Sequence, residues 1–156
     1  MRIPHFREVN RDNFDEICRL SDTLTPGQQK CVASNTYSIA EAAMYPESAW
    51  YRAVYLDDTP IGFVMLELDD PASRSADEPP SMFLWRFMVA RDHQRSGYGR
   101  QVLDLVVEKC RAEGIALLET SVEMGDESPF GFYIKYGFVD TGKALDCGEQ
   151  ILRLTM

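Results

Sequence analysis

The sequence predicts a single α/β domain over residues 1–156, built on a mixed, mostly antiparallel sheet with helices on both faces. Apolar runs of strand length alternate with segments of helical periodicity along the chain. Three strand candidates follow one another in the middle without a helix between them, which indicates a meander inside the sheet. Hydrophobic residues make up 45% and charged residues 26%, which is typical of a globular chain with a sizeable core.

The N-terminal half is expected to hold the first helices and the start of the meander. Asn10 or Asp12 can cap the first helix, and Pro46 ends the second. The expected order is a strand at 3–9, a helix to about 21, a break at 24–27, a helix at 39–45, a strand at 50–56, a turn at 57–60 and a strand at 61–69. Because side chains alternate along a strand, the last one turns four side chains to one face: Phe63, Met65, Glu67 and Asp69.

The C-terminal half is expected to alternate strands with helices. Gly114 is the predicted stop of the longest helix. The expected order is a loop at 70–81, a strand at 82–89, a helix from the glycines near 97 to 113, a strand at 115–122, a polar loop at 123–128, a helix at 129–136, a strand from 137 and a last strand at 150–156.

A glycine-rich turn, SGYG at 96–99, joins the strand at 82–89 to the long helix. The free N–H groups of a first helical turn, the helix dipole and the close approach that glycine permits together favour phosphate binding. A Walker A loop requires a lysine and a hydroxyl residue after its glycines, and this turn has neither. A dinucleotide fingerprint requires a third glycine, where Val102 stands. The pyrophosphate of coenzyme A and a tight turn without ligand remain as alternatives.

Composition excludes several classes of function. The formal net charge of −9 argues against nucleic acid as a partner and favours cationic ligands, with solubility alone as the alternative. The four cysteines form no C-x-x-C pair and the two histidines lie far apart, so no metal site is expected. No apolar run reaches the roughly 18 residues of a membrane span, and no signal peptide opens the chain, which predicts a cytoplasmic protein without membrane contact.

Two motifs resemble those of the GCN5-related N-acetyltransferases (GNAT). QRSGYG at 94–99 resembles the family's motif A, [QR]-x-x-G-x-[GA], and FMV at 87–89 precedes it at the family's spacing. FYIKYGF at 132–138 is similar to the family's L-Y-x-K-x-G-F element. The likeness covers about residues 61–156 and implies the GNAT fold, acetyl-CoA as co-substrate and N-acetyltransferase activity.

The resemblance implies a cofactor site along the strand and the turn. Backbone N–H groups at 95–100 would hold the pyrophosphate, the strand at 87–89 would pair with pantetheine, and the Val89 N–H would polarise the thioester. Asp126 stands where the family often has Asn, and its charge would repel phosphate. The predicted cofactor-binding residues are Phe87, Met88, Val89, Gln94, Arg95, Ser96, Gly97, Tyr98, Gly99, Arg100, Asp126 and Ser128.

The resemblance assigns the proton donor but not the base. Tyr133 matches the position of the family's general acid. A phenol with a pKa near 10 keeps its proton at neutral pH and can therefore donate it. The alternative is that Tyr133 only packs among the neighbouring aromatic residues. The carboxylate that some relatives carry just before motif A is missing. Glu67 is the predicted substitute, acting through a water or binding a cationic substrate, unless it pairs with Arg86.

The predicted acceptor is a small-molecule amine. CVASN at 31–35, together with Glu41 and GFVM at 62–65, is similar to bacterial spermidine and diamine acetyltransferases, which implies a polyamine. Protein N-termini, drug-like amines and a non-catalytic CoA-binding regulator are the alternatives. Many relatives are dimers, so a homodimer through the strand at 150–156 is left open. The predicted substrate-binding residues are Glu41, Glu67, Asp69 and Trp85.

Overall fold

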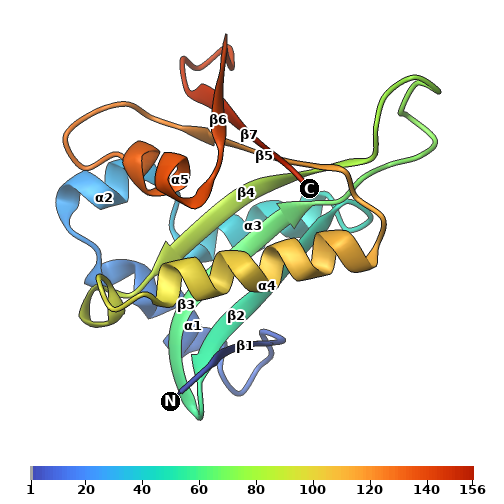
Figure 1. Ribbon diagram of the computed structural model, residues 1–156. Helices are drawn as coiled ribbons and strands as arrows, with labels where there is room; N and C mark the ends of the chain where they lie inside the picture. Colours follow the sequence, from blue (N-terminus) through green and yellow to red (C-terminus); the bar gives the residue numbers. More distant parts are fainter. Residues whose placement is uncertain (1) are drawn as a thin grey trace.

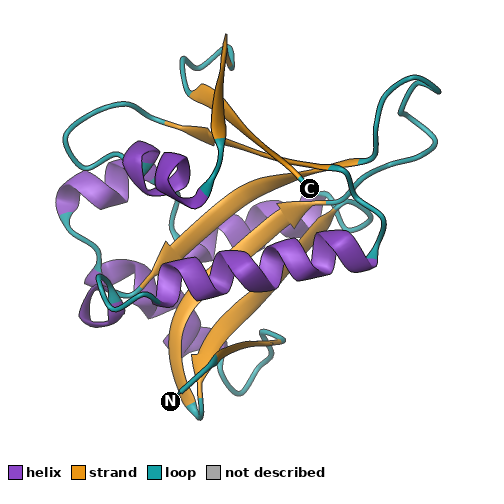
Figure 2. Ribbon diagram, in the orientation of Figure 1, coloured by secondary structure: helices purple, strands orange, loops and turns teal. Residues whose placement is uncertain are grey.

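A seven-stranded sheet with helices on both faces forms the molecule in the computed structural model, which describes residues 2–156 (Figures 1 and 2). The strands are β1 (Pro4–Arg7), β2 (Ala49–Leu56), β3 (Thr59–Glu67), β4 (Ser81–Val89), β5 (Leu117–Val122), β6 (Val139–Ala144) and β7 (Gln150–Thr155). Their order in the sheet is β1-β2-β3-β4-β5-β7-β6, and only β4 and β5 pair in parallel. The predicted fold class is confirmed.

The helices cover the two faces of the sheet in separate sets. They are α1 (Phe14–Arg19), η1 (Leu20–Thr23), α2 (Pro26–Cys31), α3 (Asn35–Met44), η2 (Arg91–His93), α4 (Tyr98–Ala112) and α5 (Phe130–Tyr136). Figure 1 shows α4 in front of β2, β3 and β4, with α1 and α3 behind them. The side chains of β3 point alternately to the two faces of the sheet. Val64 belongs to the apolar cluster of α4, while Phe63 and Met65 belong to that of α1 and α3.

The break predicted at 24–27 is confirmed only for Leu24 and Thr25, because Pro26 and Gly27 belong to α2. Thr25 caps α2 instead: its hydroxyl accepts a hydrogen bond from the Gln28 N–H, and the Gln28 side chain accepts one from the Thr25 N–H, both at 3.2 Å. Pro26 occupies the first helical position, where its missing N–H is harmless. The prediction was wrong at Pro26 and Gly27 because TPGQ is a capping box rather than a loop.

Two further boundaries differ from the prediction. α3 begins at Asn35, four residues before the predicted start, because the Ser34 hydroxyl caps it through the Tyr37 N–H at 3.1 Å. β7 lies between β5 and β6 and pairs with both, so the strand at the outer edge of the sheet is β6. The strand at 150–156, considered as a possible dimer contact, therefore has both of its edges paired within the sheet.

The first and second halves of the chain meet at the close approach of β3 and β4. A Cβ at Gly62 would lie 2.5 Å from the Met88 carbonyl oxygen, which is backbone and has little freedom to move. We expect Gly62→Ala to lower the free energy of unfolding by about 1–3 kcal/mol, as overpacking does elsewhere. Urea unfolding measures this change. Gly131→Ala, whose Cβ would meet nothing within 4 Å, is the matched control. An unaltered urea midpoint for Gly62→Ala would show that the two strands separate at little cost.

Within residues 2–156, no helix combines the length and the apolar character that crossing a membrane requires. The same residues bring together no group of three or more His, Cys, Asp or Glu side chains suited to holding a metal ion.

Candidate active site

A cavity of about 1040 Å³ lies where β4 and β5 separate. Their parallel pairing covers only the first part of each strand and ends at Leu84 and Thr120. The Thr120 hydroxyl donates to the Leu84 carbonyl at 2.9 Å and so closes the ladder at this point. Beyond it the two strands diverge, as Figure 2 shows, and helices α2 and α5 contribute the other walls.

A bulge in β4 accompanies this separation. Arg86 lies opposite Met65 of β3 and Leu84 lies opposite Leu66, so Trp85 has no partner in the register. An extra residue of this kind bends a strand and increases its twist. The Arg86 guanidinium spans the bulge by donating to the Trp85 carbonyl at 3.0 Å and to Glu41 of α3 at 2.9 Å. The bulge directs the second half of β4 away from β5.

The glycine-rich turn has the geometry of an anion site. Gly97 precedes the first residue of α4 in a left-handed conformation with φ of 86°, and no side chain caps the helix there. Arg95 is also left-handed, with φ of 60°. Alternating conformations of this kind direct successive N–H groups into one concavity. A Cβ at Gly99 would lie 3.3 Å from the Phe132 ring, so glycine keeps this wall close to α5.

The last residues of β4 direct their backbone groups toward the cavity. The Ala90 N–H bonds to the Ile61 carbonyl of β3 at 2.7 Å. Since ladder bonds in an antiparallel pair use alternate residues, Val89 and Phe87 direct their N–H and C=O groups away from β3. The Val89 carbonyl confirms this orientation, because it accepts from the Gln94 side chain at 2.9 Å. The Val89 N–H is thus available to a ligand between the strands.

Most of the predicted cofactor-binding residues line this cavity. They are Phe87, Met88, Val89, Gln94, Arg95, Gly97, Gly99, Arg100, Asp126 and Ser128. Ser96 and Tyr98 do not. The Ser96 hydroxyl bonds back to the Gln94 carbonyl at 3.4 Å, and Tyr98 packs against the apolar cluster of α4.

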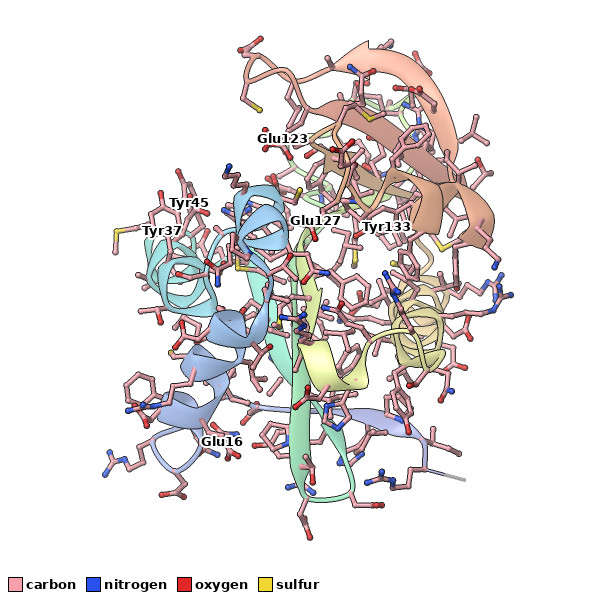
Figure 3. The ribbon with its side chains drawn as sticks, turned by 90° about the vertical axis from the view of Figure 1, so that its left-hand side faces the viewer. Glu16, Tyr37, Tyr45, Glu123, Glu127 and Tyr133 are labelled. Atoms are coloured by element: carbon pink, nitrogen blue, oxygen red, sulfur yellow. The ribbon has the colours of Figure 1, made fainter. Side chains whose placement is uncertain are left out.

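Tyr133 lies at the closed end of the diverging strands. It belongs to α5, is 5% exposed and lines the cavity (Figure 3). Its ring packs edge-on against Phe132 and Phe138, with centroids 5.3 and 5.2 Å apart. Burial raises the pKa of the Tyr133 hydroxyl well above its usual value, and a hydrogen bond with the Thr120 side chain offsets only part of this. The phenol is therefore protonated at neutral pH.

The structure does not bring the predicted acidic residues to the cavity. Glu41 is held by Arg86, and Asp69 accepts from the Ser81 N–H at 3.1 Å and lies 3.5 Å from Arg74. Glu67 lies at the exposed end of β3 and pairs with no arginine among residues 2–156, so the expected contact with Arg86 is made by Glu41 instead. Of the four predicted substrate-binding residues, only Trp85 lines the cavity.

Three other glutamates line the cavity in their place: Glu123, Glu127 and Glu149. Glu123 and Glu127 come from the loop after β5 (Figure 3), and Glu149 comes from the turn before β7. Burial, and then the negative charges of these three carboxylates, raise the pKa of the Cys31 thiol. Across the described chain none of the three forms an ion pair. The cavity thus has a cationic end, with Arg95 and Arg100, and an acidic one.

Comparison with a curated relative gives a partial match. An L-methionine sulfoximine/L-methionine sulfone acetyltransferase from Pseudomonas paraeruginosa is 30% identical over 67 residues, which is 42% of this chain. The match covers 39% of that protein's length, well under half. It is a likeness of one segment rather than of whole proteins.

Comparison with solved structures extends over the whole chain. An acetyltransferase from Thermus thermophilus has a TM-score of 0.78 at 16% identity, with all of both chains covered. The PaiA N-acetyltransferase from Thermoplasma acidophilum, in complex with coenzyme A, has a TM-score of 0.69 at 17% identity, covering 98% of this chain and 99% of that one. At identities this low, the TM-scores establish a shared fold and no more. The model of the acetyltransferase (GNAT) family matches residues 14–138, which include the glycine-rich turn and Tyr133, and the chain therefore belongs to the GNAT family.

Proposed function

We propose that this protein transfers an acetyl group from acetyl-CoA to a primary amine that carries a second positive charge, a diamine or polyamine. One observation carries the proposal. Buried Tyr133 lies at the closed end of a cavity that has an anion-binding turn on one side and unpaired carboxylates on the other. Family membership supports acetyl-CoA as the co-substrate.

The residues of the cavity fit coenzyme A. The left-handed Gly97, the uncapped start of α4 and the side chains of Arg95 and Arg100 suit a diphosphate. Gly99 leaves space where a Cβ would press on Phe132. Asp126 also lines the cavity, and its charge is better suited to the amine than to phosphate. Acetyl-CoA, when bound, supplies an activated thioester.

Two groups of the chain are assigned to the acyl transfer itself. The Val89 N–H faces the gap and polarises a carbonyl placed beside it, as an oxyanion-hole donor does. Tyr133 holds a proton that it gives to the departing sulfur, so that a thiol rather than a thiolate leaves. Its raised pKa keeps this proton in place across the neutral range.

The acidic end is assigned to the amine. A protonated amine is not a nucleophile, so one amino group must lose its proton before it attacks. We assign Glu123, directly or through a water, to accept that proton, and Glu149 to bind the second ammonium. The Glu149 carboxylate is positioned by the Ser121 hydroxyl at 3.3 Å. Trp85, beside the bulge, offers its ring to an alkyl chain or a cation.

The proposal is tested by following thiol release from acetyl-CoA with a panel of amines. We expect spermidine and short diamines to be acetylated with kcat/KM of about 10⁴ M⁻¹s⁻¹ or more, within the usual enzyme range. The panel also includes a peptide with a free N-terminus, an aminoglycoside and methionine sulfone, the last because the curated relative is named for it. Turnover confined to methionine sulfone or peptide would overturn the cationic acceptor. Acetyl-CoA binding without turnover on any amine would favour the alternative of a non-catalytic CoA-binding regulator.

A further inference from the structure

Helix α2 crosses the cavity and is fastened to both of its sides. At the β4 side, the side chains of Gln28 and Gln94 exchange hydrogen bonds of 2.9 and 3.3 Å. At the β5 side, the Thr25 hydroxyl bonds to the Glu127 carboxylate, with both oxygens at 3.0 Å. The Cys31 thiol also points to the Glu127 carbonyl, at 3.9 Å. Figure 3 shows Glu127 between α2 and the helix that carries Tyr133.

Glu127 is fitted closely to this helix. A Cβ added at Gly27 would lie 1.5 Å from one of its carboxylate oxygens, so the carboxylate rests directly on the glycine. No salt bridge holds it among residues 2–156. The glycine at this position gives the carboxylate the space it occupies beside the Thr25 hydroxyl.

The contact matters because α2 cannot hold its position alone. It has six residues and no buried side chain, and helices of this length are unstable without tertiary contacts. Yet its residues Gln28, Lys30 and Cys31 line the cavity, and the Cys31 thiol lies beside Glu127 on the acidic side. The shape of the acidic end therefore depends on what fastens α2.

We propose that Glu127 is a positioning residue: by bonding Thr25 over Gly27, its carboxylate holds α2 across the cavity and completes the binding site for the amine. This inference rests on the proposed function, because it takes the acidic end as the amine site. Glu127 then acts through geometry rather than through its charge on the amine. Displacing it should weaken amine binding more than acetyl-CoA binding, because α2 meets the cofactor side through the Gln28–Gln94 pair.

Two substitutions separate geometry from charge. Glu127→Ala removes the carboxylate. Gly27→Ala keeps it but displaces it from the helix, and the cost to folding is small because the displaced atom is the end of a flexible side chain. Thr25→Ser retains both the cap and the bond to Glu127, and is the conservative variant. Gly131→Ala, in open space on α5, is the matched control for a glycine-to-alanine change.

We expect Glu127→Ala and Gly27→Ala each to raise KM for spermidine about tenfold, the equivalent of one hydrogen bond to a charged group. KM for acetyl-CoA should change less than KM for spermidine, and the double variant should be no worse than either single one. Gly131→Ala should match the parent protein, and Thr25→Ser, which keeps the hydroxyl, should lose less affinity for spermidine than Glu127→Ala. If Gly27→Ala behaves as the parent while Glu127→Ala loses affinity, Glu127 acts by charge and the proposal is overturned.

A second measurement does not depend on turnover. Hydrogen exchange of the α2 amides, such as the Gln29 N–H that bonds to the Thr25 carbonyl at 2.9 Å, reports how firmly the helix is held. Exchange should become about tenfold faster in Glu127→Ala and Gly27→Ala. Unaltered exchange in both variants would overturn the fastening even in a protein without acetyltransferase activity. Faster exchange with no turnover on any amine would instead contradict the proposed function alone.

Discussion

Tyr133→Phe is expected to lower kcat for amine acetylation by about 10²–10⁴-fold, the usual contribution of a general acid. The phenylalanine ring fills the same space against Phe132 and Phe138, so packing is kept and only the hydroxyl is lost. The dissociation constant of acetyl-CoA should change little, because the turn and the end of β4, which we propose bind it, lie outside this substitution. Steady-state kinetics and calorimetric titration with acetyl-CoA separate the two quantities.

Tyr136→Phe is the matched control for this result. Tyr136 also belongs to α5, but its hydroxyl donates to Asp104 at 2.7 Å and is thereby engaged outside the transfer step. Its loss should cost about 1 kcal/mol of stability and leave kcat near the parent value. Equal kcat for Tyr133→Phe and the parent protein would remove the proton-donor role. A large fall shared by both variants, together with a lower Tm, would point to packing instead.

That most residues proposed for the cofactor line one cavity could be predicted from the sequence, because they are close together in the chain. The glycine-rich turn and the end of β4 are contiguous in the chain, so the residues that form the anion site carry their own signal. The element at 132–138 is also contiguous. Its alignment with the family motif singled out Tyr133, which lines the cavity. One local signal was misread: Thr25 and Gln28 form a capping box, but Pro26 and Gly27 between them indicated a break.

The side of the cavity that we propose for the amine could not be predicted, because its glutamates come from distant segments. Glu123 follows β5, and Glu149 precedes β7, which inserts between β5 and β6 and brings its turn to the cavity. Strand order of this kind is a property of the whole sheet and leaves no local pattern. Glu67, by contrast, lies on a strand that alternation alone places, but the strand ends at an exposed position outside the cavity. Periodicity gives the face of a strand and not its distance from a site.

The double substitution Glu123→Gln with Glu149→Gln is expected to lower kcat/KM for spermidine about 10–100-fold, the range for lost hydrogen bonds to charged groups. A monoamine of similar length, which has no second ammonium, should lose much less through KM, since Glu149 has no partner in it. The remaining loss, in kcat and shared by both amines, belongs to Glu123. Steady-state kinetics with the two substrates separate these contributions.

Glu67→Gln distinguishes the two assignments of the acidic residues. If Glu67 is the base or an amine-binding group, as residue pattern alone suggested, this single change lowers kcat/KM for spermidine and the double variant leaves it high. The geometry predicts the reverse, because Glu123 and Glu149 line the cavity and Glu67 does not. Glu67→Gln and the double variant both change the net charge. A general electrostatic effect on a cationic substrate would therefore lower kcat/KM for spermidine in both variants, and more strongly at low ionic strength. Only a loss confined to the double variant and persistent at high salt places the amine between β5 and the turn before β7.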